Sequence, residues 1–159
     1  MSDPAASFPG AHAQPTDWLR LADEYRQAAH VLANRGRESG HHLWSPFRLV
    51  AIHAIELYLS ALLLHAGREP SHIRALQHDL AARADLAMAS GLVLRKRTAA
   101  HLVTMSTSRE YVVTRYGAEL TSSLSQLNRL AATLDEVAEK VRNAIAARPS
   151  TAQRTSARS

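Results

Sequence analysis

Apolar residues fill positions 46–65 of the chain almost without interruption. This stretch, PFRLVAIHAIELYLSALLLH, follows Ser45, which can cap a helix, and precedes Gly67, a residue type that commonly ends one. Its apolar side chains cover most directions around a helix axis, so the helix must be surrounded by protein or by lipid. His53 and Glu56 leave no uncharged run long enough for a membrane span. The pattern therefore predicts the central helix of a bundle.

Three polar residues interrupt this apolar helix along one side. At about 100° per residue, His53, Glu56 and Ser60 fall within a wedge of roughly 60°. A polar stripe on a buried helix is most often a satisfied contact inside a bundle or at a subunit boundary. The stripe is nevertheless the first place to look for function.

Four further amphipathic patterns accompany the central helix. They predict helices from Thr16 to about Gly36, from about Arg68 to Gly91, from about Arg95 to Arg115, and from Leu120 or Thr121 to about Arg148. Hydroxyl residues around position 107 favour a kink or break there. Short loops join the five segments, and four of the segments stop at a glycine: Gly36, Gly67, Gly91 and Gly117. We expect an all-α, up-and-down bundle of about five antiparallel helices.

Composition divides the chain into three parts. Residues 1–15 hold three of the six prolines and predict a disordered lead, residues 16–148 form the bundle, and residues 149–159 predict a disordered basic tail. The net charge of +5 comes mainly from four arginines after position 141, because residues 1–141 hold 15 basic against 14 acidic residues and are nearly neutral. A neutral body disfavours broad, nonspecific binding of nucleic acid.

Several classes of chemistry are excluded or disfavoured. The chain has no cysteine, which excludes disulfides, thiolate metal sites and cysteine nucleophiles. The histidine spacings do not suit a chelating helix face, and no glycine-rich phosphate loop occurs, so we expect neither a metal nor a cofactor. The N-terminus lacks the features of a secretory signal, which predicts a soluble cytoplasmic protein with no membrane role.

Three segments together resemble the HEPN superfamily of helical-bundle proteins. They are AIHAIELYLSALLLHAG (51–67), QHDLAARADLAMASGL (77–92) and REYVVTRYG (109–117). That family combines an apolar A-x-E-L-x-L-K-A-L-L-like helix with a His-Asp-Leu helix and a Tyr and Arg-Tyr segment, and the matching positions here are His78, Asp79, Tyr111 and Arg115. Ser60 replaces the lysine common in the central helix, and Gly117 replaces a proline present in many relatives.

The resemblance implies a homodimeric bundle with one of two activities. Active HEPN proteins are metal-independent endoribonucleases that use an R-x(4–6)-H pair from each protomer. Inactive members bind RNA, nucleotides or other proteins, often beside a nucleotidyltransferase partner. Both departures from the family pattern put a fully shared function in doubt. The missing lysine and the nearly neutral body favour either the binding role or a purely structural, dimer-forming role over catalysis.

Spacing alone leaves several candidate Arg and His pairs. Arg48 with His53 fits, as do Arg37 with His42, Arg35 with His41 or His42, and Arg95 with His101. Metal-free RNA cleavage suits a histidine that titrates near neutrality and an arginine that stays charged.

We favour Arg48 and His53 as the catalytic pair, because Arg48 lies in a first helical turn and Glu56 can orient His53. Arg95, Arg97 and His101 are the alternative. The sequence thus predicts a HEPN-like dimeric domain that binds RNA, a nucleotide or a nucleotidyltransferase. The alternatives are a toxin-type or defence-type endoribonuclease and a structural dimerisation adaptor.

Overall fold

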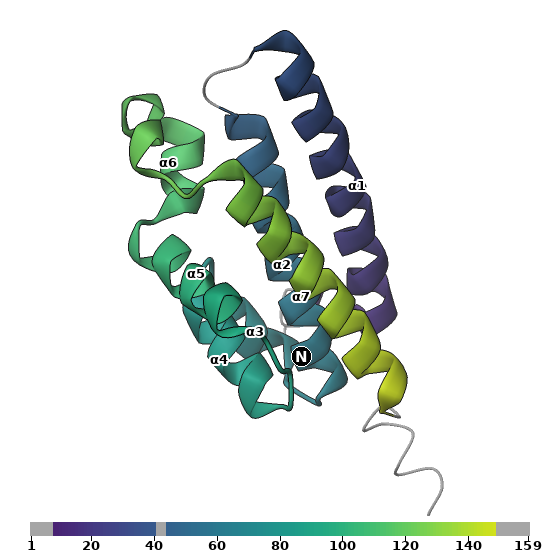
Figure 1. Ribbon diagram of the computed structural model, residues 1–159. Helices are drawn as coiled ribbons and strands as arrows, with labels where there is room; N and C mark the ends of the chain where they lie inside the picture. The colour runs from purple at the N-terminus through teal and green to yellow at the C-terminus, as the bar shows by residue number, and fades with distance from the viewer. Residues whose placement is uncertain (1–7, 41–43, 149–159) are drawn as a thin grey trace, which may run out of the picture.

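The regular secondary structure is helical throughout the described part of the chain, which confirms the predicted all-α class (Figure 1). The computed structural model describes residues 8–40 and 44–148. In order, the helices are α1 (Pro15–Ser39), α2 (Ser45–His65), α3 (Pro70–Ala75), α4 (Leu80–Ala89), α5 (Lys96–Thr107), α6 (Glu110–Tyr116), the 3-10 helix η1 (Ala118–Ser123) and α7 (Leu127–Ala147).

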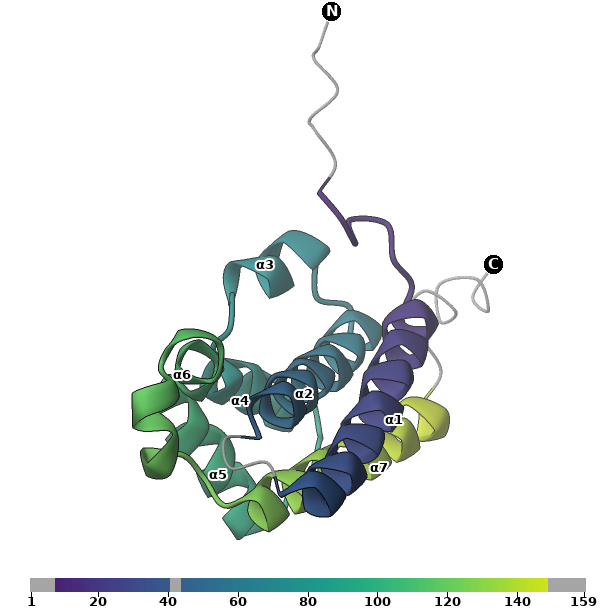
Figure 2. The ribbon, with the colours of Figure 1, turned by 90° about the horizontal axis from the view of Figure 1, so that it is seen from above.

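Helix α2 lies at the centre of the bundle. Seen from above, α1 and α7 lie along one side of it, while α3, α4 and α6 cover the other side (Figure 2). Five of its large apolar side chains are almost completely buried: Ile52, Ile55, Tyr58, Leu59 and Leu63. By length and composition α2 is apolar enough to cross a membrane, but 72% of its most apolar window is buried inside the bundle. Packing in the protein core therefore accounts for its apolar character.

The first helix is longer than the sequence pattern predicts. Gly36 does not end it, because α1 continues to Ser39 and Gly40 takes the left-handed conformation instead, with φ 64°. Gly36 is buried under the ring of Trp44, which would collide with any Cβ at this position. Trp44 occupies the N-cap position of α2, so Ser45 is the first helical residue and not the cap that the sequence predicts.

Two predicted helices are each divided by a break. The segment after Gly67 forms α3 and α4 around a turn at Gln77, which has a φ of 48°. Asp79 caps α4 by accepting a hydrogen bond of 2.9 Å from the backbone N–H of Ala82. The expected break near residue 107 separates α5 from α6, with Arg109 at φ 51°. The last long helix begins at Leu127, after η1, and not at 120 or 121.

The sequence predicts a disordered lead over residues 1–15, and the structure describes the second half of that segment. Residues 8–14, which we call the N-terminal strap, lie against the bundle before α1 begins. The guanidinium of Arg74 lies 4.7 Å from the centre of the Phe8 ring, and Gly10 packs on the ring of Trp18. These aromatic contacts give the strap an apolar anchor that its Pro and Gly content does not indicate. Residues 1–7, His41, His42 and the predicted tail at 149–159 lie outside the described residues.

Candidate functional site

The polar stripe predicted on the central helix borders a cavity. His53, Glu56 and Ser60 all line a space of about 450 Å³, which we call the α2 cavity. The strap, α1, α2, α3 and α4 contribute its walls. Its apolar lining consists of Phe8, Pro9, Trp18, Leu57, Pro70 and Ile73, and the other polar lining residues are Arg74, Gln77, His78 and Arg83.

A carboxylate holds two histidines at the wall of this cavity. Glu56, only 7% exposed, places its Oε1 3.0 Å from Nδ1 of His78 and its Oε2 3.5 Å from Nδ1 of His53. Both imidazoles remain 39% exposed. We call these three residues the His-Glu-His cluster. Since Nδ1 of each ring faces the carboxylate, Nε2 is the nitrogen left to meet a ligand.

Aromatic rings support both histidines. Tyr25 of α1 makes a T-shaped contact with the His53 ring, with a centroid separation of 4.6 Å and an interplanar angle of 89°. Tyr111 of α6 lies 4.4 Å from His78 with the ring planes tilted by 32°. The guanidinium of Arg115 lies 6.0 Å from the Tyr111 ring, so Arg115, Tyr111 and His78 form one stacked series from α6 to the turn before α4.

The sequence reasoning missed Arg83, which is the most deeply placed charge at the cavity. The side chain is buried at 6% exposure, its Nε donates to Ser60 Oγ at 3.2 Å, and its Nη2 donates to the carbonyl of Ile73 at 3.3 Å. Burial lowers the pKa of Arg83, and the carboxylates of Glu56 and Asp79 partly offset that shift. One signal was available, because Arg83 stands between Leu80 and Ala84 in the apolar stripe of its helix.

Arg48 does not join His53 at the cavity. Its Nη1 donates to Glu110 Oε1 at 2.9 Å and to the carbonyl of Ser125 at 2.7 Å. Arg48 is 6% exposed and Glu110 is fully buried, and Ser125 Oγ also donates to both Glu110 oxygens. The guanidinium is thus committed to fixing α6 and the start of α7 against α2. The predicted catalytic pair of Arg48 and His53 has no shared site in this arrangement.

The alternative pair also lacks a common surface. His101 is buried at 7% exposure and its Nδ1 lies 2.7 Å from Thr133 Oγ1. Burial lowers the pKa of His101, which favours the neutral ring. Arg97 and Arg95 are exposed, and the backbone N–H of Arg95 donates to Glu136 at 2.8 Å.

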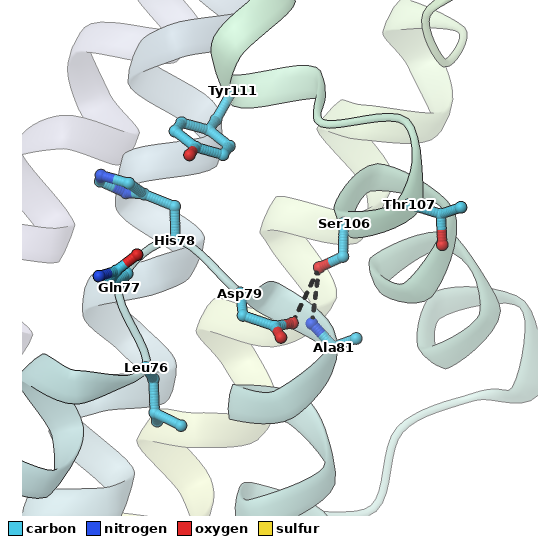
Figure 3. Close-up of a pocket in the computed structure, with 8 residues that line it drawn as sticks. All are labelled: Leu76, Gln77, His78, Asp79, Ala81, Ser106, Thr107 and Tyr111. Atoms are coloured by element: carbon cyan, nitrogen blue, oxygen red, sulfur yellow. Dashed lines mark hydrogen bonds between the residues drawn. The ribbon is translucent and has the colours of Figure 1, made fainter.

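A second cavity of about 420 Å³ lies across the turn before α4 (Figure 3). Gln77 and His78 border both cavities. In the second one, Ser106 Oγ accepts a hydrogen bond from the Ala81 N–H at 2.9 Å and donates to Asp79 at 3.3 Å (Figure 3). Asp79 therefore serves as a helix cap joined to α5, and the His-Glu-His cluster does not include it.

Comparisons of the chain with family models, curated proteins and solved structures find no match. The resemblance to HEPN proteins therefore rests on the short motifs alone. Within the residues that the structure describes, no group of three or more His, Asp or Glu side chains is arranged to hold a metal ion.

Proposed function

We propose that this chain is a binding domain that holds a nucleotide or an RNA end in the α2 cavity. The observation that carries the proposal is the His-Glu-His cluster, which borders a cavity of ligand size beside a buried arginine. Pockets for small ligands commonly enclose about 300–1,000 Å³ and combine apolar walls with a few polar groups. Phe8 and Trp18 supply aromatic surface for a base, and the cluster supplies hydrogen-bonding groups for its edge.

Binding suits the geometry better than the cleavage reaction assigned to Arg48 and His53. Cleavage by that pair needs Arg48 free to stabilise the phosphorane, whereas its charge is already paired with Glu110. One feature favours metal-independent cleavage as a second candidate. The two half-exposed histidines share one carboxylate, so their Nε2 atoms can act as an acid and a base.

Titration with AMP, CMP, GMP, UMP and a short single-stranded RNA tests the proposal, with heteronuclear NMR shifts as the readout. We expect at least one probe to shift the signals of His53 and His78. Glu56→Gln should weaken that binding about tenfold, because both imidazoles lose their charged partner. Arg97→Ala is the control, since Arg97 is exposed and does not line the cavity. A lack of shifts with every probe at millimolar concentration would exclude the proposal.

The same samples separate binding from cleavage. Incubating the RNA with the protein and a chelator at neutral pH should leave the RNA intact if the domain only binds. Cleavage that persists with the chelator and disappears in His53→Ala and in His78→Ala would establish the second candidate instead.

We also propose the homodimer that the sequence predicts. Leu21 and Val31 of α1 are 40% and 63% exposed, which leaves apolar surface on that helix for a second copy. A cytoplasmic location and a nucleotidyltransferase partner remain predictions from the sequence.

A further inference from the structure

We infer that the α2 cavity takes the anionic group of its ligand, a phosphate or a carboxylate, at Arg83, and that Arg83 makes the site prefer a charged ligand over its neutral counterpart. The inference rests on the proposed function only in placing the ligand in this cavity.

The first argument concerns charge. Arg83 is 6% exposed, and its hydrogen bonds go to two neutral oxygens, Ser60 Oγ and the Ile73 carbonyl. In the described part of the chain, other arginines form ion pairs: Arg48 with Glu110 and Arg26 with Asp135. No such pair forms at Arg83 among the same residues. A buried charge without a contacting counter-charge is costly, and a bound anion removes that cost.

The second argument concerns hydrogen bonding. Nη1 of Arg83 is buried and has no partner among the described residues, although Arg83 lines the α2 cavity. A guanidinium fork matches the oxygens of carboxylates and phosphates, so an anion can satisfy the N–H groups and the charge together. A water molecule can satisfy the N–H group but leaves the charge uncompensated.

The neighbouring carboxylates do not fill this role. Both oxygens of Glu56 face the histidine rings, and Asp79 caps α4 and accepts a hydrogen bond from Ser106. They act on Arg83 only through space, where they partly offset the cost of burying it. Arg74 adds a second positive charge to the cavity lining.

Affinities for AMP and adenosine test the preference, because the two differ only by the phosphate. We expect the wild-type protein to bind AMP at least tenfold more tightly than adenosine. Arg83→Met keeps a long unbranched side chain without the charge and should reduce this ratio to near one. Arg97→Gln is the control, since it removes one positive charge from an exposed position that does not line the cavity, and it should retain the ratio. Equal affinities in the wild-type protein would overturn the inference and leave the proposed function intact.

A measurement without any nucleotide covers the case in which neither probe binds. Phosphate and acetate, each compared with chloride at equal ionic strength, should raise the midpoint of thermal unfolding of the wild-type protein. Phosphate also stabilises folded proteins in general because it is excluded from their surface, so the effect of the site is the difference in shift between wild type and Arg83→Met. This difference should be positive, and the larger difference identifies which anion the site prefers. The ligand-free variant should be at least as stable as the wild type, because an uncompensated buried charge has been removed.

If Arg83→Met fails to fold, Arg83→Lys, which keeps the charge but not the fork, should show a reduced anion shift. Equal anion shifts in wild type and variant, or no shift in either, would overturn the inference.

Discussion

Two buried arginines, Arg48 on α2 and Arg83 on α4, have different electrostatic environments. Arg48 forms an ion pair with Glu110 and also donates to the Ser125 carbonyl, whereas Arg83 donates only to neutral oxygens. The sequence pointed to Arg48 through its spacing from His53, but spacing along a helix does not reveal a partner from another helix. This difference separates an arginine that holds the fold from one that is available to a ligand.

At the residue scale, the Arg48 ion pair yields a stability prediction. Arg48→Met should lower the free energy of unfolding by about 3–5 kcal/mol, because the fully buried carboxylate of Glu110 loses its cation. Urea unfolding measures the change, and the exposed Arg115→Met should change stability by less than about 0.5 kcal/mol. The double variant Arg48→Met/Glu110→Leu should recover part of the loss. An unchanged free energy of unfolding in Arg48→Met would show that the ion pair with Glu110 does not stabilise the fold.

The candidate site was partly predictable at this scale. Helical periodicity alone placed His53, Glu56 and Ser60 on one side of the central helix, and the structure finds all three at one cavity. The sequence indicated His78 as a candidate site residue only through the resemblance to the HEPN motifs. Its contact with Glu56 depends on a turn between α3 and α4, which side-chain periodicity does not encode.

At the scale of elements, the candidate site depends more on the breaks between helices than on the helices themselves. Apolar residues keep a helical spacing through Ile73, Leu76 and Leu80, so the pattern predicts one helix where the structure has two. The left-handed conformation of Gln77 interrupts the helix, and His78 follows it at the boundary of both cavities. The break near residue 107 was predictable because hydroxyl residues compete there for backbone hydrogen bonds.

The prediction at this scale concerns the N-terminal strap. Phe8→Ala should make Trp18 more accessible to solvent and lower the free energy of unfolding by about 1 kcal/mol, because the cation-π contact with Arg74 and one wall of the cavity are lost. Fluorine NMR of fluorotryptophan-labelled protein resolves Trp18 from Trp44 and reports its solvent exposure. His12→Ala, an exposed change within the same strap, is the control. An unchanged Trp18 signal in Phe8→Ala would show that the strap does not cover this side of the bundle.

At the scale of the whole molecule, one polar network joins the three longest helices. The hydroxyl of Tyr58 on α2 donates to Asp23 Oδ1 of α1 at 2.5 Å, and Asp23 also pairs with Arg142 of α7. Tyr58 is fully buried at the centre of the bundle. The sequence predicted that α1 and α7 are amphipathic, but not that a tyrosine would link them, because the three residues come from distant parts of the chain.

This network predicts a loss of stability in alkali. Burial raises the pKa of Tyr58 to about 12, the hydrogen bond and charge of Asp23 add to that rise, and Arg142 opposes it. Below about pH 10 tyrosine is protonated in both folded and unfolded chains, so its contribution to stability is complete. As the pH rises from about 10 to 12, the unfolded tyrosine loses its proton while the folded one keeps it. The free energy of unfolding should fall by about 2–3 kcal/mol over this range.

Comparison with Tyr58→Phe isolates this effect from the titration of other groups. At neutral pH the variant should be less stable by about 1.5–3 kcal/mol, because Asp23 loses a charge-assisted hydrogen bond. Guanidinium unfolding at intervals from pH 8 to 12 should show the difference between wild type and variant shrinking above pH 10, since phenylalanine has no hydroxyl to ionise. Tyr116→Phe, at an 81% exposed position, should follow the wild-type curve. If the stability difference between wild type and Tyr58→Phe stayed constant to pH 12, Tyr58 would ionise as readily in the folded chain as in the unfolded one. In that case the Tyr58 hydrogen bond would not control how the three long helices respond to pH.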